Sequence, residues 1–179
     1  MLDLKNTALV VVDVQGKLAQ LMTDREPLFA NLQRMVRGAN ALELPVLWVE
    51  QLPDKLGATI GEIAQELGGQ SPISKASFSC AGEAAFNTEL EATGCRQVLL
   101  IGIETHVCVY QTAMHLLDEG LEVELVADAT SSRTAANRDL AIAKMQHAGV
   151  GLTSTEMVLF ELMGTATHPA FRDIQKIIK

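Results

Sequence analysis

The chain has 179 residues, of which 48% are hydrophobic, and its 14 basic and 22 acidic residues give a formal net charge of −8. This size and composition predict one globular domain over residues 1–179 with a sizeable core, and they exclude a disordered chain. Lys and Arg do not cluster, aromatic residues make up only 4%, and no apolar run approaches the ~20 residues that span a bilayer, so we expect neither nucleic acid nor a membrane as a partner.

The N-terminus and the cysteines indicate the compartment. The first residues carry no basic region and no cleavage site of the kind found in secretory signals. Cys80, Cys95 and Cys108 are odd in number and widely spaced, which is not the pattern of a disulfide framework. We therefore expect a cytoplasmic protein in a reducing environment. Since nucleic acid and membranes are not expected as partners, a small molecule is the better candidate for its ligand.

Short apolar, β-branched runs alternate with segments of helical periodicity along the whole chain. The apolar runs predict six strands, at residues 7–13, 45–49, 72–75, 98–101, 122–126 and 150–153. Helical spacing predicts helices at residues 26–44, 79–92, 105–119, 135–148, 156–163 and 168–178. A capping box at Thr59–Glu62 predicts one more short helix, which ends at Gly68.

Four of these segments carry more specific expectations. Gly102 is expected to end the strand 98–101, and Thr105 to cap the following helix. The strand 122–126 alternates in polarity, which predicts a place nearer an edge of the sheet. The helix 156–163 is apolar around most of its circumference, so it is either deeply buried or covered by another subunit.

Strands that alternate with helices imply right-handed βαβ crossovers and a parallel sheet. We therefore predict an α/β protein with three layers, α/β/α, and a Rossmann-like six-stranded parallel sheet. If the strands run in the order 3-2-1-4-5-6, strand order reverses between the first and the fourth strand. Ligands of such sheets bind beyond the carboxyl ends of the strands at this point.

Three chemically capable residues follow three different strands. Singly, each has a plainer interpretation: Asp13 as a turn residue, Lys75 as a solvated charge, and Cys108 as a small buried hydrophobe. In the strand order above, however, Asp13 and Cys108 face each other across the crevice, and Lys75 reaches in from the third strand. Their joint placement favours a chemical site.

The chemistry expected of this group is nucleophilic. Cys108 lies in the first turn of a helix, where free N–H groups favour an anion, and the Lys75 ammonium favours it too, so we expect a thiolate. Asp13 can accept the thiol proton, donate it to a leaving amine, and then activate water. Lys75 would keep Asp13 ionised and hold the thiolate in place.

Three motifs, at residues 12–15, 75–79 and 102–109, resemble those of the isochorismatase-like cysteine hydrolase superfamily. The resemblance extends over essentially the whole chain and implies a sheet of six parallel strands with helices on both faces. It implies that Asp13, Lys75 and Cys108 form a catalytic triad, and that an acyl substrate forms a thioester with the cysteine.

The same resemblance places a non-proline cis peptide between Ile103 and Glu104, and an oxyanion hole at the backbone N–H groups of Glu104 and Cys108. A carboxylate this close to a thiolate raises the pKa of the thiol, so Glu104 is expected to pair with Lys75 or with a cationic substrate. Cys80 and Cys95 are expected to be inert. A less favoured alternative is that Cys80 forms a disulfide with an oxidised Cys108.

Several further residues are candidates for the substrate pocket; they are Gln15, Gln51, Phe78, Ile103 and His106. For Gln51, the polarity of an exposed loop is the simpler interpretation. His106 can be a second proton carrier, but a local hydrogen bond is the interpretation we favour.

The sequence differs from the nicotinamidases of this superfamily, which place Asp-x-His metal ligands after the second strand. The loop at residues 50–54 has no histidine, and the four histidines of the chain are scattered. We therefore expect no metal and no other cofactor. The chain looks most like the subgroup of isochorismatase-domain-containing proteins.

The resulting hypothesis is a metal-independent cysteine hydrolase that cleaves a small amide or related acyl substrate. Two alternatives are a non-catalytic member that binds a metabolite or a protein, and a redox sensor based on Cys108. The apolar helix 156–163 and the resemblance to acyl hydrolases both favour a homo-oligomer, a dimer or larger.

Overall fold

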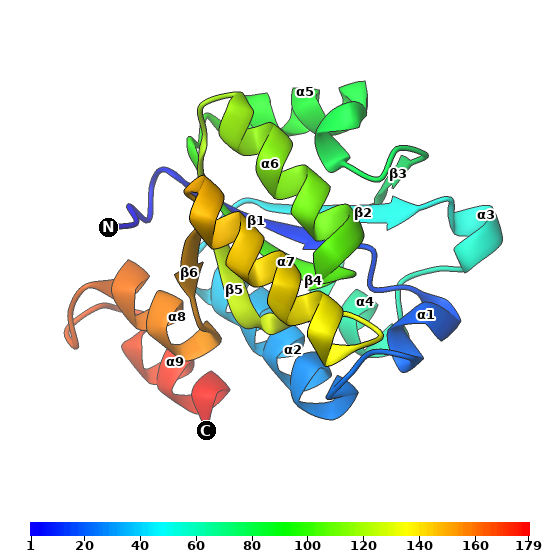
Figure 1. Ribbon diagram of the computed structural model, residues 1–179. Helices are drawn as coiled ribbons and strands as arrows, with labels where there is room; N and C mark the ends of the chain where they lie inside the picture. The colour runs from blue at the N-terminus through cyan, green and yellow to red at the C-terminus, as the bar shows by residue number, and fades with distance from the viewer.

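The sheet at the centre of the computed structural model, which describes residues 1–179, has six parallel strands. They are β1 (Thr7–Val12), β2 (Val46–Gln51), β3 (Ile73–Lys75), β4 (Gln97–Ile103), β5 (Glu122–Ser131) and β6 (Gly151–Thr153). Their order is β3-β2-β1-β4-β5-β6, so the predicted order is confirmed (Figure 1). It reverses between β1 and β4, which pair directly.

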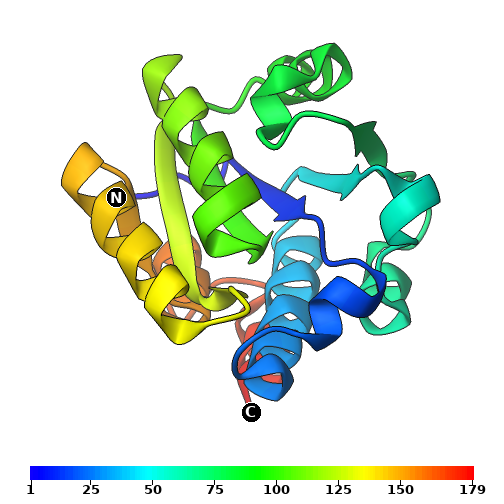
Figure 2. The ribbon, with the colours of Figure 1, turned by 45° about the vertical axis from the view of Figure 1, so that its right-hand side comes forward.

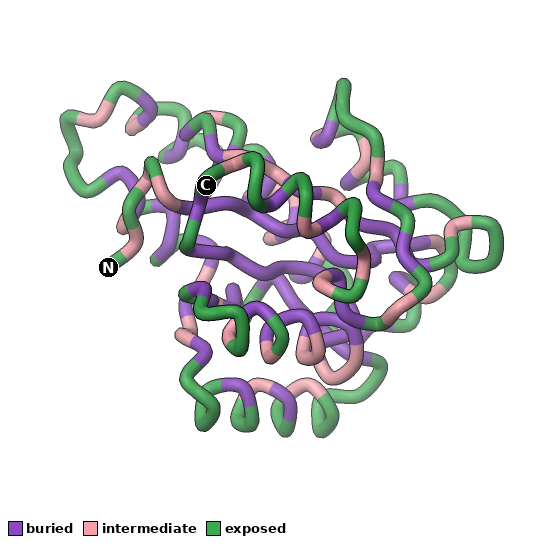
Figure 3. Tube along the Cα trace, turned by 90° about the horizontal axis from the view of Figure 1, so that it is seen from above, coloured by how far each residue is buried: buried purple, intermediate pink, exposed green.

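Alternate residues of the central strands enter two separate cores, one on each face of the sheet. Leu9 and Val11 of β1 belong to the core that is covered by α2 (Arg25–Ala41), α8 (Thr155–Met163) and α9 (Phe171–Ile178). Val10 and Val12 belong to the core that is covered by α5 (Ala84–Thr93), α6 (Tyr110–Asp118) and α7 (Ala135–Ala148). Both faces of the central strands are therefore buried, and Figure 3 shows these purple strands running between the helices. The predicted three-layer architecture is confirmed.

Short helices lie beyond the carboxyl ends of β1 and β2. These are α1 (Gly16–Gln20), α3 (Pro53–Leu56) and α4 (Gly61–Ala64), the last continued by the 3₁₀ turn Gln65–Leu67. In Figure 1, α1 and α3 lie ahead of the two arrowheads, and Figure 2 shows the chain leaving β1 and turning into α1. The sequence pattern predicts only the segment containing α4, because α1 and α3 are single turns without a periodic face.

Gly102 does not end its strand as expected. β4 continues through it to Ile103, with a shift of register against β5 between Leu100 and Gly102. The backbone at Gly102 has φ +115°, and a Cβ atom there would lie 2.1 Å from the carbonyl oxygen of Val12. The glycine is therefore required for the close approach of β4 to β1, rather than for a turn.

Two predicted caps are not formed, because tertiary contacts take the side chains. The Thr59 hydroxyl donates to Glu50 Oε1 at 2.7 Å and accepts from Trp48 Nε1 at 2.8 Å, and α4 begins after it, at Gly61. The Thr105 hydroxyl bonds to the hydroxyl of Thr130, at 2.9 Å. The segment Thr105–Val109 is a π-helical turn that leads into α6, a kind of irregularity common at functional sites.

Several other boundaries differ from the prediction; for example, the helix predicted at 26–44 ends at Ala41, and the one predicted at 168–178 begins at Phe171. The segment 79–92 is divided into a 3₁₀ turn, Cys80–Gly82, and α5. β5 runs five residues beyond the predicted end, to Ser131, and lies next to the edge strand β6. Its position near an edge is as predicted, but its length brings a further segment to the carboxyl end of the sheet.

The apolar helix 156–163 corresponds to α8, and only part of its surface is buried. Val158, Leu159 and Leu162 are buried in the core that also contains Leu9 and Val11, whereas Met157 and Phe160 remain 60% and 39% exposed. None of the helices combines the length and the apolar composition that crossing a bilayer requires.

Candidate active site

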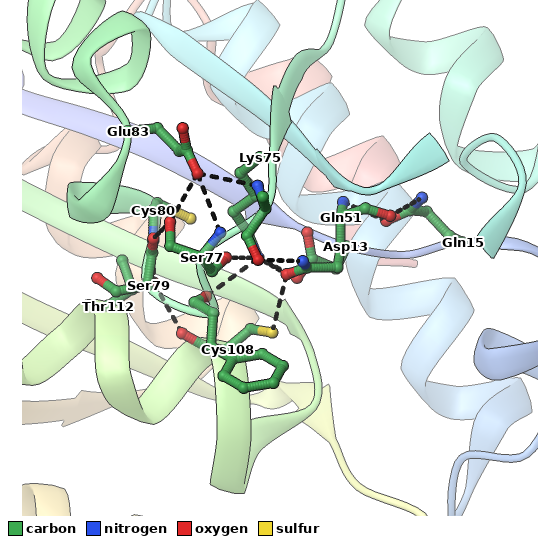
Figure 4. Close-up of polar contacts among 12 residues, drawn as sticks. Asp13, Gln15, Gln51, Lys75, Ser77, Ser79, Cys80, Glu83, Cys108 and Thr112 are labelled. Carbon is green, nitrogen blue, oxygen red and sulfur yellow. Dashed lines mark hydrogen bonds and ion pairs between the residues drawn. The ribbon is translucent and has the colours of Figure 1, made fainter. Parts of the chain in front are cut away.

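The carboxyl ends of β1, β2 and β3 and the turn after β4 bring the predicted group together (Figure 4). Asp13 follows β1 directly, and its N–H donates to the carbonyl oxygen of Val49 in β2, at 3.1 Å. Gln51 and Lys75 are paired residues at the ends of β2 and β3. Cys108 lies in the π-helical turn after β4. Parallel pairing thus places four side chains from distant parts of the sequence at one edge.

Asp13 and Lys75 form a buried ion pair. Lys75 Nζ lies 2.8 Å from Asp13 Oδ2, and the two side chains are 0% and 2% exposed, respectively. The backbone of Asp13 has φ +52°, a left-handed conformation that aspartate tolerates better than most residues. Removal of two charges from water is costly unless they meet each other, so this pair fixes both side chains relative to the sheet.

Three other acceptors surround the Lys75 ammonium. Nζ donates to Gln51 Oε1 at 2.6 Å, to the carbonyl oxygen of Ser77 at 3.2 Å and to that of Phe78 at 3.0 Å. An ammonium has only three protons to donate, so this one is fully satisfied. Lys75 is therefore a fixed positive charge between the acid and the loop that follows β3.

Asp13, by contrast, keeps capacity to accept a proton. Apart from the ion pair with Lys75, no protein group makes a well-aligned hydrogen bond to either of its buried oxygens. Burial raises the pKa of Asp13 above its ordinary value, while the charge of Lys75 acts in the opposite direction. A carboxylate with a raised pKa next to a thiol is suited to act as a general base.

Cys108 is not the thiolate that its place in the sequence predicts. The residue is only 8% exposed. Burial raises the pKa of the Cys108 thiol, and the negative charge of Asp13 raises it further, which together outweigh the opposite effect of Lys75. The thiol therefore keeps its proton at neutral pH until that proton moves to a neighbouring base.

Gln51 belongs to the site, contrary to its interpretation as exposed loop polarity. It is the last residue of β2, it is 6% exposed, and its Nε2 donates to the carbonyl oxygen of Ala76 at 2.8 Å. This bond turns Oε1 towards Lys75, and the same oxygen lies 3.9 Å from Cys108 Sγ. Gln51 thus bridges the ammonium and the thiol.

Gln15 supports Gln51 and is not exposed to a substrate. Its side chain is fully buried, its Oε1 accepts from the N–H of Gln51 at 2.7 Å, and its Nε2 donates to the carbonyl oxygen of the same residue at 3.1 Å. Nε2 also donates to the carbonyl oxygen of Gly57, at 2.7 Å. The Gln15 amide therefore holds the backbone of Gln51 in place. The expectation that Gln15 lines the substrate pocket is corrected.

Glu104 pairs with a residue that the sequence analysis does not single out. Its Oε1 accepts from Arg133 Nε at 3.0 Å and from the Arg133 N–H at 3.1 Å, so Lys75 is not its partner. Arg133 comes shortly after the end of β5, at the same edge of the sheet. The sequence analysis missed Arg133 because it predicted that β5 ends at residue 126, which left Arg133 away from the carboxyl end of the sheet. The peptide bond between Ile103 and Glu104 is cis.

The remaining predicted residues divide into buried and accessible ones. The Ile103 side chain is fully buried in the core, so it does not line a pocket, whereas Phe78 is 55% exposed beside the Lys75 loop. His106 Nδ1 lies 2.9 Å from Ser132 Oγ, which is the local hydrogen bond that we favoured.

Cys80 and Cys95 are buried, and burial raises the pKa of Cys80 to about 12. No cluster of three or more His, Cys, Asp and Glu side chains is arranged to hold a metal ion.

Comparison with known proteins identifies the family of this chain. Residues 7–157 match the model of the Isochorismatase domain. Human isochorismatase domain-containing protein 2 is 38% identical over 175 residues, which are 97% of this chain and 83% of the human protein.

Two solved structures share the fold closely. One is described as the MAR1 ribonuclease of Caenorhabditis elegans, with TM-score 0.93, 35% identity, and 99% and 91% of the two chains covered. The other is YcaC of Pseudomonas aeruginosa, with TM-score 0.92, 26% identity, and 98% and 90% covered. The family model and the human relative show that the chain belongs to the isochorismatase family, and this membership supports a hydrolase-type function.

Proposed function

We propose that this chain is a cysteine hydrolase that cleaves a small amide or related acyl compound without a metal ion. One observation carries the proposal. A buried carboxylate, Asp13, lies 2.8 Å from the fixed Lys75 ammonium, and Gln51 Oε1, which accepts from that ammonium at 2.6 Å, lies 3.9 Å from Cys108 Sγ. Base, cation and nucleophile are the parts that acyl transfer through sulfur requires.

In the first half of the reaction, Asp13 takes the proton of the Cys108 thiol as Sγ attacks the carbonyl carbon of the substrate. The carbonyl electron pair moves onto oxygen, and the oxyanion is stabilised by the backbone N–H groups of Glu104 and Cys108. Protonated Asp13 then gives its proton to the leaving nitrogen. The C–N bond breaks, and a thioester with Cys108 remains.

In the second half, Asp13 takes a proton from water while the water oxygen attacks the thioester carbon. The C–S bond breaks, the acid product leaves, and the proton held by Asp13 returns to sulfur. Lys75 stays an ammonium throughout, since it is held by four acceptors. Its charge offsets the negative charge that passes between the carboxylate and the thiolate.

Two further observations support the proposal. No backbone carbonyl accepts a hydrogen bond from the N–H of Glu104, as an oxyanion donor requires. In addition, the P. aeruginosa YcaC structure is described with covalent acrylamide. Acrylamide is an electrophile that thiolates attack, which is in keeping with a reactive thiol in this group of proteins.

RNA is the second substrate class to consider, because the C. elegans relative is described as a ribonuclease. The net charge of −8 and the absence of a basic cluster in the sequence make this chain a weak candidate for binding a polyanion. We therefore place RNA behind small acyl compounds, and include it in the test.

We also propose that the chain forms a homo-oligomer. Met157 and Phe160 project from α8 into solvent in the isolated chain, beside a helix face that is otherwise buried. Apolar side chains of this size are typical of surfaces that another subunit covers.

The experiment that tests the function is a panel of small amides, esters and a short RNA, followed by product analysis and intact-mass spectrometry. The expected result is turnover of an amide or ester and an acyl adduct on Cys108 in the wild-type protein. Cys108→Ser should abolish both, while Cys95→Ser, which removes a buried thiol outside the site, should leave both unchanged.

Turnover that survives in Cys108→Ser would overturn the proposal. Reversible oxidation of Cys108 without any acyl adduct would favour a redox sensor, and binding without turnover would favour a non-catalytic member. Cleavage of RNA alone would establish the second candidate.

A further inference from the structure

We propose that Glu83 is a positioning residue, which shapes the loop that holds Lys75 in place. The inference rests on the proposed function only in that Lys75 must be fixed for the reaction. Glu83 lies outside the three sequence motifs and immediately precedes α5. Its carboxylate faces the loop Ala76–Phe78 from the side opposite to the Lys75 ammonium (Figure 4).

A single oxygen of Glu83 gathers three donors from this loop. Oε1 accepts from the N–H of Ala76 at 2.9 Å, from the N–H of Ser77 at 3.0 Å and from the Ser77 hydroxyl at 2.8 Å. Backbone N–H groups that converge on one carboxylate oxygen make strong, charge-assisted hydrogen bonds. The loop is therefore held by its N–H groups on one side.

The same loop is held by its carbonyl groups on the other side. The carbonyl oxygens of Ser77 and Phe78 accept from Lys75 Nζ, at 3.2 and 3.0 Å. Consecutive peptide units of one short loop thus meet Glu83 with two N–H groups and Lys75 with the two carbonyl groups that follow them. Both charges are therefore bonded to the same loop, and the position of the ammonium depends on the carboxylate through the loop backbone.

The local backbone brings Glu83 close enough for this role. The 3₁₀ turn Cys80–Gly82 leads into it, and the N–H of Glu83 donates to the carbonyl oxygen of Cys80 at 3.0 Å. A Cβ atom at Gly82 would lie 2.6 Å from Ser77 Oγ. Only glycine allows the turn to approach the loop so closely.

The charge state of Glu83 suits the role as well. Hydrogen bonds from the backbone and hydroxyl of Ser77 are the main causes that lower the pKa of Glu83, with Ala76 and the Lys75 charge adding to them. The carboxylate is therefore ionised at neutral pH. The side chain is partly exposed and contributes nothing to either core, so its substitution should affect the loop before it affects the fold.

The test measures alkylation of Cys108 by iodoacetamide across pH in the intact chain, with peptide mapping to resolve the three cysteines. Glu83→Ala should slow alkylation at pH 8 by about 10-fold and move the pH profile to higher pH, because a displaced ammonium no longer favours the thiolate. Glu83→Gln keeps an oxygen acceptor and should recover most of the wild-type rate.

Asn87→Ala is the matched control. Asn87 Nδ2 donates to the carbonyl oxygen of Ala81 at 3.0 Å, so this variant loses a side-chain hydrogen bond of the same segment without touching the loop. Its alkylation profile should match the wild type. If Glu83→Ala fails to fold, Ser77→Ala, which removes one of the three donors, should show a smaller shift in the same direction.

An unchanged profile in Glu83→Ala, or in Ser77→Ala if that variant replaces it, would overturn the positioning role. Equal losses in Glu83→Ala, Glu83→Gln and Asn87→Ala would overturn it too, because they would indicate general damage to the segment. The proposed hydrolase function fails separately, if the wild type gives neither turnover nor an acyl adduct on Cys108 with the amide and ester panel, while Glu83→Ala still shifts the alkylation profile.

Discussion

Lys75 Nζ lies 2.8 Å from Asp13 Oδ2, and neither side chain has more than 2% of its surface exposed. The two residues come from strands that are not neighbours in the sheet, since β2 lies between β1 and β3. The long lysine side chain therefore reaches past the end of β2, where Gln51 meets it with a hydrogen bond of 2.6 Å. A single polar cluster thus ties three strands together.

Asp13→Asn should reduce kcat by about 10³-fold for any substrate that the panel identifies, because the amide cannot accept the thiol proton. The variant also leaves the buried Lys75 ammonium without a counter-charge, at a cost of about 3 kcal/mol in the free energy of unfolding. Steady-state kinetics and urea denaturation measure the two effects. Asp54→Asn, which changes an exposed aspartate in α3, is the control.

A kcat for Asp13→Asn within threefold of the wild type would contradict the role of general base. A loss of stability without a loss of activity would assign Asp13 to the fold alone.

The buried thiols predict a loss of stability at alkaline pH. Burial raises the pKa of Cys80 to about 12, and that of Cys108 is raised as well, whereas both thiols titrate near their ordinary value once unfolded. For a group whose pKa is raised by folding, the stabilisation is complete below the unfolded pKa and is lost as pH rises towards the folded one. Each buried thiol should therefore reduce the free energy of unfolding by about 1.4 kcal/mol per pH unit above roughly pH 9.

Urea denaturation of the wild type and of Cys80→Ala between pH 8 and pH 11 measures this slope. The alanine variant should lose stability less steeply with pH, because it has one fewer thiol to ionise on unfolding. Parallel curves for the two proteins would show that Cys80 ionises as easily in the folded chain as in the unfolded one.

Arg133→Ala should weaken the site through Glu104. The Glu104 side chain is 8% exposed, while its partner is 56% exposed, so water replaces part of the lost ion pair. We expect a loss of about 1 kcal/mol in stability. We also expect slower alkylation of Cys108, because the unpaired carboxylate, four residues before Cys108 in the chain, opposes the thiolate. A double-mutant cycle with Glu104→Gln isolates the pair.

If Arg133→Ala and Arg133→Ala/Glu104→Gln lower the alkylation rate equally, the carboxylate is not the cause. Arg138→Ala is the matched control, because Arg138 is an arginine of the same region whose partners, Asp24 and Asp139, are exposed.

The exposed part of α8 predicts self-association. Light scattering at micromolar concentration should give a mass of at least two chains for the wild type. Met157→Glu/Phe160→Glu should shift the mass towards one chain, because a carboxylate buried in an interface loses its hydration. Leu140→Glu changes an exposed apolar residue of α7 and serves as the control. A monomeric wild type would contradict the proposed oligomer.

The sequence predicted the strand order and the meeting of Asp13, Lys75 and Cys108, because parallel strands bring their carboxyl ends to one edge whatever the details of their loops. It did not predict the place of Gln51, since β2 was expected to end two residues early, at Val49, which left this side chain in a loop. Arg133 was missed for the same reason at the end of β5.

The ionisation of Cys108 was mispredicted for a different physical reason. A helix N-terminus and a lysine can be inferred from the sequence, but the exclusion of water cannot, and here burial and the adjacent carboxylate decide the pKa of the thiol. The predicted caps at Thr59 and Thr105 are also absent for a reason that the local sequence does not contain: their hydroxyls form hydrogen bonds with Glu50 and Thr130, which are not neighbours in the helix.

The close contact between β4 and β1 at Gly102 affects the geometry of the candidate active site. It is the β4 residue that faces Val12, immediately before Asp13, and it lies two residues before Glu104. A single methyl group at this position would act as a wedge between the strands and would widen the gap that the proton must cross from sulfur to carboxylate. The absence of a side chain at Gly102 therefore sets how closely β1 and β4 approach each other, and with it the separation between Asp13 and the turn that carries Cys108.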